Sequence, residues 1–284
     1  MLSLVKFFYQ ILFQKFFSFY VQSSLHVGLA VLCLLTITHL EFDWSLTLPL
    51  VVFVFCSTVL TYNFIRYATA APSYFFVKGK RQKSIRALSY LCGMVCGVCC
   101  IYLPLSLLWV AFGLGVISFL YVFPLTTRSR GFRNVKHVKT MMVATVWASV
   151  SVVFPWVTNE VPWTSLHLIF WCQMFCWTLA TLIPFEIRDM QWDDPSIRTL
   201  PQSIGISGAK LVGYLAVGGV FVLELWRSMW EWTAVLGTAV VCLIVVGMLW
   251  NTKAKQTTYY AAFWVESLPV VWLLVKTIEK GSGI

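Results

Sequence analysis

The sequence predicts an all-α, polytopic membrane protein with nine transmembrane helices. Hydrophobic residues make up 59% of the 284 residues and charged residues only 11%, and the mean hydropathy is +0.80. This is too little polar surface to cover a water-soluble globule. The apolar residues also fall into separate runs, each long enough to cross a hydrocarbon core of about 30 Å as a helix. The composition therefore excludes the soluble classes of protein.

The first predicted element is an interfacial amphipathic helix over residues 1–22. Its polar residues recur at helical spacing, and Phe, Leu, Ile and Tyr fill most of the remaining positions. This pattern is typical of a helix that lies in the plane of the membrane interface. The segment lacks the uninterrupted apolar core and small-residue cleavage site of a signal peptide, so we expect it to be retained.

A single transmembrane domain follows over residues 23–284, and its nine apolar runs are the predicted spans. They cover residues 23–40, 45–68, 86–104, 105–123, 140–158, 163–186, 209–226, 232–250 and 258–277. Between the sixth and seventh spans, Ser196–Gly205 contains proline, glycine and polar residues. We expect this segment to be a loop that is long enough to fold over a site.

Lysine and arginine predict the orientation of the bundle, because they concentrate in short cytoplasmic loops. With a cytoplasmic N-terminus, the cytoplasmic segments contain all of the 21 basic residues except Arg227, Lys276 and Lys280. The C-terminus then lies on the opposite side. This bias, together with attraction to anionic lipid head groups, accounts for the net charge of +10. We therefore expect no nucleic-acid partner.

The strongest candidate site is the acidic segment at the end of the sixth span. If that helix continues, Glu186, Asp189 and Asp193 stand at positions i, i+3 and i+7 and project from one face. Carboxylates are rare in this chain, and a group of them at a membrane boundary indicates a bound cation, a phosphate-bound metal or a basic partner. These three residues are the predicted metal ligands.

The segment resembles the second aspartate motif of the UbiA-type intramembrane prenyltransferase superfamily. The resemblance rests on Glu186-Ile-Arg-Asp189, Asp193, the run Ile197-Arg-Thr-Leu-Pro201 with Gly205, and Tyr121-Val-Phe-Pro124. The span count and the orientation also agree with that family. The resemblance implies a nine-span bundle in a membrane, which we expect to be a bacterial inner membrane, with the site facing the cytoplasm between the second and sixth helices.

Members of that family hold Mg²⁺ on two Asp-rich motifs, one after the second span and one after the sixth. The metal bridges to a prenyl diphosphate, whose leaving group needs hard cations to neutralise its developing charge. Here the first motif is replaced by Tyr62-Asn-Phe-Ile-Arg-Tyr67: Asn63 is kept, but no aspartate follows. No acidic residue occurs between Asp43 and Glu160. The chain is therefore a divergent member by resemblance, and Mg²⁺ is expected only if it is catalytic.

Two interpretations of the altered site remain open. In the first, Arg66 pairs with Glu186 or Asp189 where the metal would lie, which makes a structural clamp. In the second, basic side chains bind a phosphate directly and transfer still occurs, with Asn63, Arg66, Asp189 and Asp193 as the catalytic set. The candidate phosphate-binding residues are Lys78, Arg81, Arg128, Lys136, Lys139 and Arg198.

Three functions are consistent with this sequence. The first is an isoprenoid-binding or prenyl-transferring protein with a membrane lipid or isoprenoid as ligand. The second is a non-catalytic helical subunit that binds partner subunits in a larger membrane complex. The third is a transporter that uses Glu266, since a carboxylate inside a span is a functional candidate by default.

Overall fold

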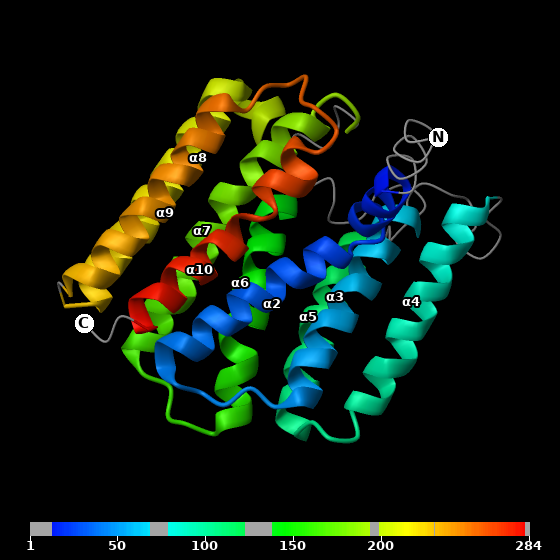
Figure 1. The fold of residues 1–284 in the computed structure, drawn as a ribbon, viewed down its shortest axis with the longest axis horizontal. Helices are drawn as coiled ribbons and strands as arrows, with labels where there is room; N and C mark the ends of the chain where they lie inside the picture. The colour runs from blue at the N-terminus through cyan, green and yellow to red at the C-terminus, as the bar shows by residue number, and fades with distance from the viewer. Residues whose placement is uncertain (1–12, 69–78, 123–137, 194–198, 230, 282–284) are drawn as a thin grey trace, which may run out of the picture.

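The computed structural model describes residues 13–68, 79–122, 138–193, 199–229 and 231–281, and every regular element in them is helical (Figure 1). The elements are α2 (Leu25–Phe42), α3 (Leu48–Ala68), α4 (Lys80–Cys99), α5 (Leu105–Val122), α6 (Val138–Asn159), α7 (Ser165–Asp189), α8 (Leu200–Arg227), α9 (Trp232–Asn251), the π-helix η3 (Tyr260–Val265) and α10 (Leu268–Gly281). Each predicted span corresponds to one helix, except that η3 and α10 together form the last one. The all-α prediction is confirmed.

Within the described ranges, seven helical segments are long and apolar enough to cross a membrane, which confirms an integral membrane protein. They are α2, α3, α6, α7, α8, α9 and the segment that combines η3 with α10. Helix α5 offers only the shorter apolar stretch Leu105–Phe119, and α4 begins with the basic residues Lys80 and Arg81. The count of nine spans therefore stays a prediction.

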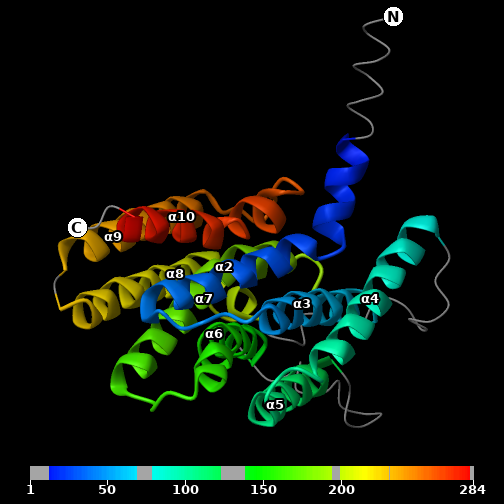
Figure 2. The ribbon, with the colours of Figure 1, turned by 60° about the horizontal axis from the view of Figure 1, so that its bottom comes forward.

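The helices close into a bundle in which the first span packs against the last one. Helix α2 packs against α3, α6 and α10, so the first and last spans lie side by side (Figure 1). Helix α7 is central and contacts α6, α8, α9 and η3, and its Trp177 packs on Trp272 of α10 with ring centroids 4.4 Å apart. Helices α4 and α5 form one edge of the bundle, where they pack against α3 and α6 (Figure 2).

At one end of the bundle, buried charged side chains connect the helices to one another. We call Glu41, Glu224, Arg227, Lys276 and Glu279 the buried ion-pair cluster. Arg227 of α8 pairs with Glu41 of α2, and its Nη2 lies 2.7 Å from Glu224 Oε1. Lys276 of α10 lies 3.0 Å from Glu279 and 3.7 Å from Glu224. Three helices that are distant in sequence are thus tied together at this end.

The start of α8 differs from the prediction. The sequence predicted a loop over Ser196–Gly205 and a span from 209, but the helix begins at Leu200. The backbone N–H of Thr199 donates to Gln202 Oε1 at 2.9 Å, and Pro201 stands in the first turn, where a missing N–H costs nothing. Gly205, at φ 74° and ψ 170°, interrupts the helix without ending it.

The last span also differs, because it was predicted as one helix over 258–277. The π-helix η3 ends at Val265, and α10 begins at Leu268 after a turn that contains Glu266. Pro269 lacks a backbone donor and is tolerated only in the first turn of the new helix. The π-helix and this turn decide which way Glu266 points.

Residues 13–22 are helical, and Figure 2 shows this helix extending beyond the bundle. Its Phe17 packs on Tyr259 and Phe263, with ring centroids 4.9 Å apart in both cases. The first half of the predicted interfacial helix, over 1–12, lies outside the described residues. The interfacial position of the whole segment therefore stays a prediction.

Candidate functional site

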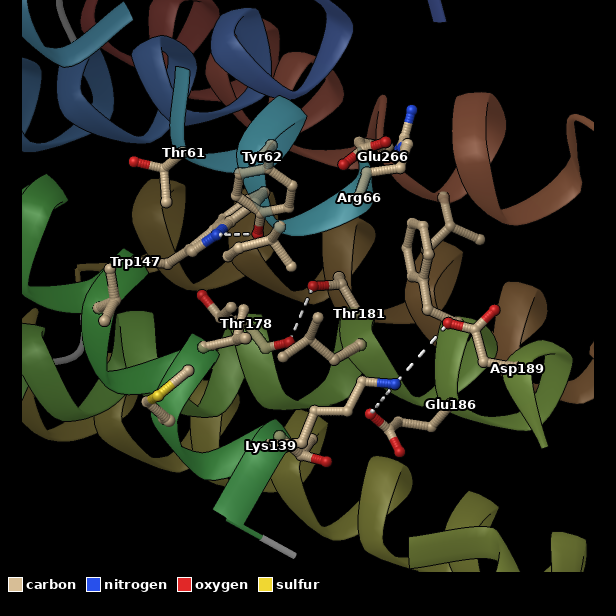
Figure 3. A pocket seen from close by; sticks show the side chains of 18 of the residues that line it. Thr61, Tyr62, Arg66, Lys139, Trp147, Thr178, Thr181, Glu186, Asp189 and Glu266 are labelled. Atoms are coloured by element: carbon tan, nitrogen blue, oxygen red, sulfur yellow. Dashed lines mark hydrogen bonds and ion pairs between the residues drawn. The ribbon is translucent and has the colours of Figure 1, made fainter. Parts of the chain in front are cut away.

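A cavity of about 370 Å³ lies between α3, α6, α7 and the turn that joins η3 to α10 (Figure 3). Its wall is mostly apolar, with side chains such as Ile65, Met142, Val146 and Leu182. Charged side chains gather at one end: Arg66, Lys139, Glu186, Arg188, Asp189, Asp193 and Glu266. An apolar chamber with a polar end suits a lipid whose head group lies at that end.

The acidic wall of the cavity surrounds a lysine. Lys139 Nζ, from the first turn of α6, lies 3.3 Å from Glu186 Oε1, 3.8 Å from Asp189 Oδ2 and 3.1 Å from Asp193 Oδ2. Helix α7 ends at Asp189, so Asp193 lies beyond it, but its carboxylate still reaches the same ammonium. The three predicted metal ligands thus surround one positive charge, the ammonium group of Lys139.

Arg66 does not pair with this acidic wall. The predicted clamp between Arg66 and Glu186 or Asp189 is therefore wrong, because Lys139 is the basic residue that contacts both of these carboxylates. Arg66 Nη1 donates to the carbonyl of Gln22 at 2.9 Å and to that of Val21 at 3.4 Å. It therefore joins α3 to the residues that precede α2. Arg66 and Asp189 do line the same cavity, so the shared pocket expected between the second and sixth spans is present, and its role as a site stays a prediction.

Glu266 occupies the wall opposite Lys139, next to Arg66 (Figure 3). Its carboxylate makes no hydrogen bond or ion pair within the described part of the chain, and it faces the cavity. Arg66 and Arg188 supply the positive charges that act on it. Beside it, Trp147 Nε1 donates to the hydroxyl of Tyr62 at 2.6 Å. This wall therefore presents one carboxylate and one phenol to a ligand.

Arg188, the third cation among the described lining residues, is already engaged. Arg188 Nε lies 2.8 Å from Asp189 Oδ1, and its guanidinium stacks over the ring of Phe185 at 5.2 Å. Glu186 is 3% exposed, and its second oxygen has no hydrogen-bond partner among the described residues. Thr140, whose buried hydroxyl is likewise without a described partner, also lines the cavity. The charged end thus keeps polar atoms that a ligand or water could satisfy.

Other predicted site residues lie elsewhere. Asn63 is buried and donates to Ser89 Oγ of α4 at 3.1 Å, because it stands about 100° around α3 from Tyr62. Arg81 lies in a separate, open cleft against residues 13–22, where it donates to Ser18. The structure does not bring either residue to the cavity. The other predicted phosphate ligands fall outside the described residues: Lys78, Arg128, Lys136 and Arg198.

These side chains do not fit a magnesium ion as they are arranged. Mg²⁺ requires an open octahedral set of oxygen ligands, whereas here an ammonium lies among the carboxylates. Within the described ranges no group of three or more His, Cys, Asp or Glu side chains could hold a metal. The opposite wall adds a single carboxylate, Glu266, and no second acidic motif. The metal role of Glu186, Asp189 and Asp193 stays a prediction.

Sequence reasoning assigned Lys139 to phosphate and missed its role as the partner of the acidic wall. One signal pointed to it: Lys139 is the last residue of the basic loop and directly precedes the apolar run of the fifth span. A lysine in that position extends its charge along the helix towards the nearest polar region. The buried ion-pair cluster was also missed, since the sequence only placed its members on the side opposite the cytoplasm.

Two solved structures share this arrangement of helices. The apo structure of a UbiA homolog from Aeropyrum pernix K1 matches with a TM-score of 0.61 at 13% identity, over 89% of this chain and 97% of that one. A UbiA homolog from Archaeoglobus fulgidus, bound to GPP and Mg²⁺, matches with a TM-score of 0.57 at 9% identity, over 92% and 99%. No family profile and no curated protein matches the sequence. The chain has the UbiA-type prenyltransferase fold, as the sequence predicted.

Proposed function

We propose that this membrane protein binds an isoprenoid or a related lipid in the cavity, at a degenerate prenyl-diphosphate site. The observation that carries the proposal is the apolar cavity with one charged end, which lies between α3, α6 and α7 in a UbiA-type fold. The similar fold from Archaeoglobus fulgidus holds GPP and Mg²⁺, which favours an isoprenoid as the class of ligand. The positive-inside bias favours a cytoplasmic N-terminus and a cytoplasmic charged end.

The site is degenerate because two electrostatic components are missing. The wall formed by α3 carries Tyr62 and Arg66 in place of carboxylates, and the Lys139 ammonium lies among the carboxylates at the end of α7. A diphosphate leaving group needs cations that stabilise its developing charge, and the loss of one such stabiliser costs about 3 to 4 kcal/mol of barrier. Efficient prenyl transfer is therefore not the function that this geometry supports best.

Binding can be tested with a photoactivatable isoprenoid and the purified protein in detergent. We expect crosslinks to map to the cavity-lining parts of α3, α6 and α7. Val146→Trp places a large ring in the cavity and should abolish the crosslink, whereas Val222→Trp, on the exposed surface of α8, should leave it unchanged. Equal labelling of both variants and the parent protein would show that the cavity is not the site.

Magnesium-dependent transfer is the second candidate, and the relative that holds GPP and Mg²⁺ is the observation that favours it. It requires Glu186, Asp189 and Asp193 to exchange the lysine for a metal. Labelled prenyl diphosphate, incubated with the purified protein with and without Mg²⁺, separates the two candidates. Turnover that depends on Mg²⁺ and disappears in Asp189→Ala would establish transfer, and its absence supports binding alone.

A further inference from the structure

The charged end of the cavity is balanced by its own side chains. Among the described lining residues, the four carboxylates Glu186, Asp189, Asp193 and Glu266 face the three cations Arg66, Lys139 and Arg188, so the sum of charges is −4 + 3 = −1. A diphosphate would add further negative charge to these described side chains, whose formal charges already sum to −1. In a space of low dielectric constant, like charges at short range repel strongly.

Two of these three cations are held by carboxylates. Lys139 is surrounded by three carboxylates, Arg188 is paired with Asp189, and Arg66 donates to two backbone carbonyls. A phosphate could recruit Lys139 or Arg188 only by breaking these ion pairs, and it would then leave the carboxylates exposed to one another. Among the described side chains, an uncharged head group enters this end without such rearrangement.

Glu266 is the group that lacks a partner. It follows the π-helix η3 directly, and π-helical turns occur frequently at functional sites. The turn after η3 presents the carboxylate to the cavity, where no described side chain hydrogen-bonds to it. A carboxylate away from bulk water is costly unless a donor satisfies it. A hydroxyl donor would form a charge-assisted O–H···O⁻ bond, one of the stronger hydrogen bonds available.

The surroundings of Glu266 fit a ligand with one hydroxyl and an apolar tail. The Tyr62 phenol and the Thr61 side chain lie on the same wall, and the Tyr62 oxygen already accepts from Trp147, so its own proton is available for donation. Farther along, Val143, Val146 and Leu182 make the wall apolar. A hydroxyl head group can therefore donate to Glu266 while its apolar chain lies along α6 and α7.

We infer that the natural occupant is an isoprenoid with an uncharged hydroxyl head group, a polyprenol or an isoprenoid hydroquinone, and that Glu266 accepts the hydrogen bond from its O–H. The inference rests on the proposed function, since it assigns the ligand of that same cavity. It differs from a prenyl-diphosphate site in needing neither a metal nor a free basic side chain. Glu266 is thus the residue that selects the head group.

The test compares two probes that differ only in the head group, farnesol and farnesyl diphosphate, as competitors of the photoactivatable isoprenoid. We expect farnesol to compete at a concentration at least tenfold lower than farnesyl diphosphate, with no effect of Mg²⁺ on either. Glu266→Leu should weaken competition by farnesol at least tenfold. Glu266→Gln keeps an amide oxygen as acceptor and should lose less. Glu160→Gln, an exposed residue in the loop before α7, is the matched control and should not change competition.

The outcomes separate the two proposals. If farnesyl diphosphate competes better than farnesol, or if Glu266→Leu binds farnesol as the parent protein does, the neutral head group is wrong while isoprenoid binding stands. If neither probe competes and the crosslink is insensitive to Val146→Trp, isoprenoid binding itself fails. Loss of both probes in Glu266→Leu would indicate a misfolded site. The nearly isosteric Glu266→Gln then gives the comparison with the parent protein.

Discussion

Within the described part of the chain, replacing Lys139 by methionine removes the one ammonium that lies among three carboxylates. Each contact, at 3.1 to 3.8 Å, has a Coulomb energy of about 4 to 5 kcal/mol at an effective dielectric constant of 20. Desolvation offsets much of this, and removing one partner of a buried pair costs about 3 to 5 kcal/mol in practice. The Lys139 side chain is 22% exposed, so we take the lower limit, about 3 kcal/mol.

The measurement is thermal unfolding in detergent, followed by tryptophan fluorescence. A loss of about 3 kcal/mol corresponds to a fall in Tm of about 6 to 12 °C for a chain of this size. Lys253→Met removes an exposed lysine after α9 and is the matched control. Adding Asp189→Asn and Asp193→Asn to Lys139→Met should restore most of the stability, because the carboxylates then no longer repel one another.

Magnesium provides an independent readout of the same substitution. With the ammonium gone, the three carboxylates should accept a divalent cation, which stabilises the folded state by about 2.7 kcal/mol at 100 times its Kd. Mg²⁺ should therefore raise the Tm of Lys139→Met and leave the parent protein unchanged. An unaltered Tm in Lys139→Met, or a parent protein that Mg²⁺ stabilises more than the variant, would refute the view that Lys139 takes the place of a metal.

Two further substitutions test the stability of the helical bundle outside the cavity. Arg227→Met should lower the free energy of unfolding by about 3 to 5 kcal/mol, because it leaves the Glu224 carboxylate, which is 0% exposed, without its closest cation; Glu160→Gln is the control, and equal Tm values would contradict the role of the buried ion-pair cluster. Gly205→Ala should cost about 1 to 3 kcal/mol, since φ 74° and ψ 170° form a region that only glycine occupies readily. Gly218→Ala, on the same helix with open space around it, should be neutral or slightly stabilising, and a loss equal to that of Gly205→Ala would remove the argument from backbone conformation.

The sequence contained enough information to predict the helical spans and the acidic segment. Hydrophobic length is a property of neighbouring residues, and each apolar run of about 20 residues must form a helix in a membrane to satisfy its own backbone. The spacing of Glu186 and Asp189 along α7 is likewise local, so their common face followed from helical geometry. The boundaries of α8 were missed because Pro201 and Gly205 indicate a loop by composition, whereas the first occupies the first turn and the second only kinks the helix.

The partner of the acidic wall depended on how the helices are rotated and packed, which spacing along one helix does not specify. Arg66 and Lys139 were both available by sequence, but the rotation and position of α3 bring Arg66 to the carbonyl groups before α2, and the first turn of α6 brings Lys139 to the carboxylates. Asn63 faces α4 for the same reason. The orientation of Glu266 depends on a π-helix and a turn, which arise from packing against α7 rather than from any periodic pattern. Composition and periodicity thus determined that this is a helical membrane protein with an acidic site, and only the tertiary contacts between distant helices decided which charges neutralise one another there and which carboxylate remains for a ligand.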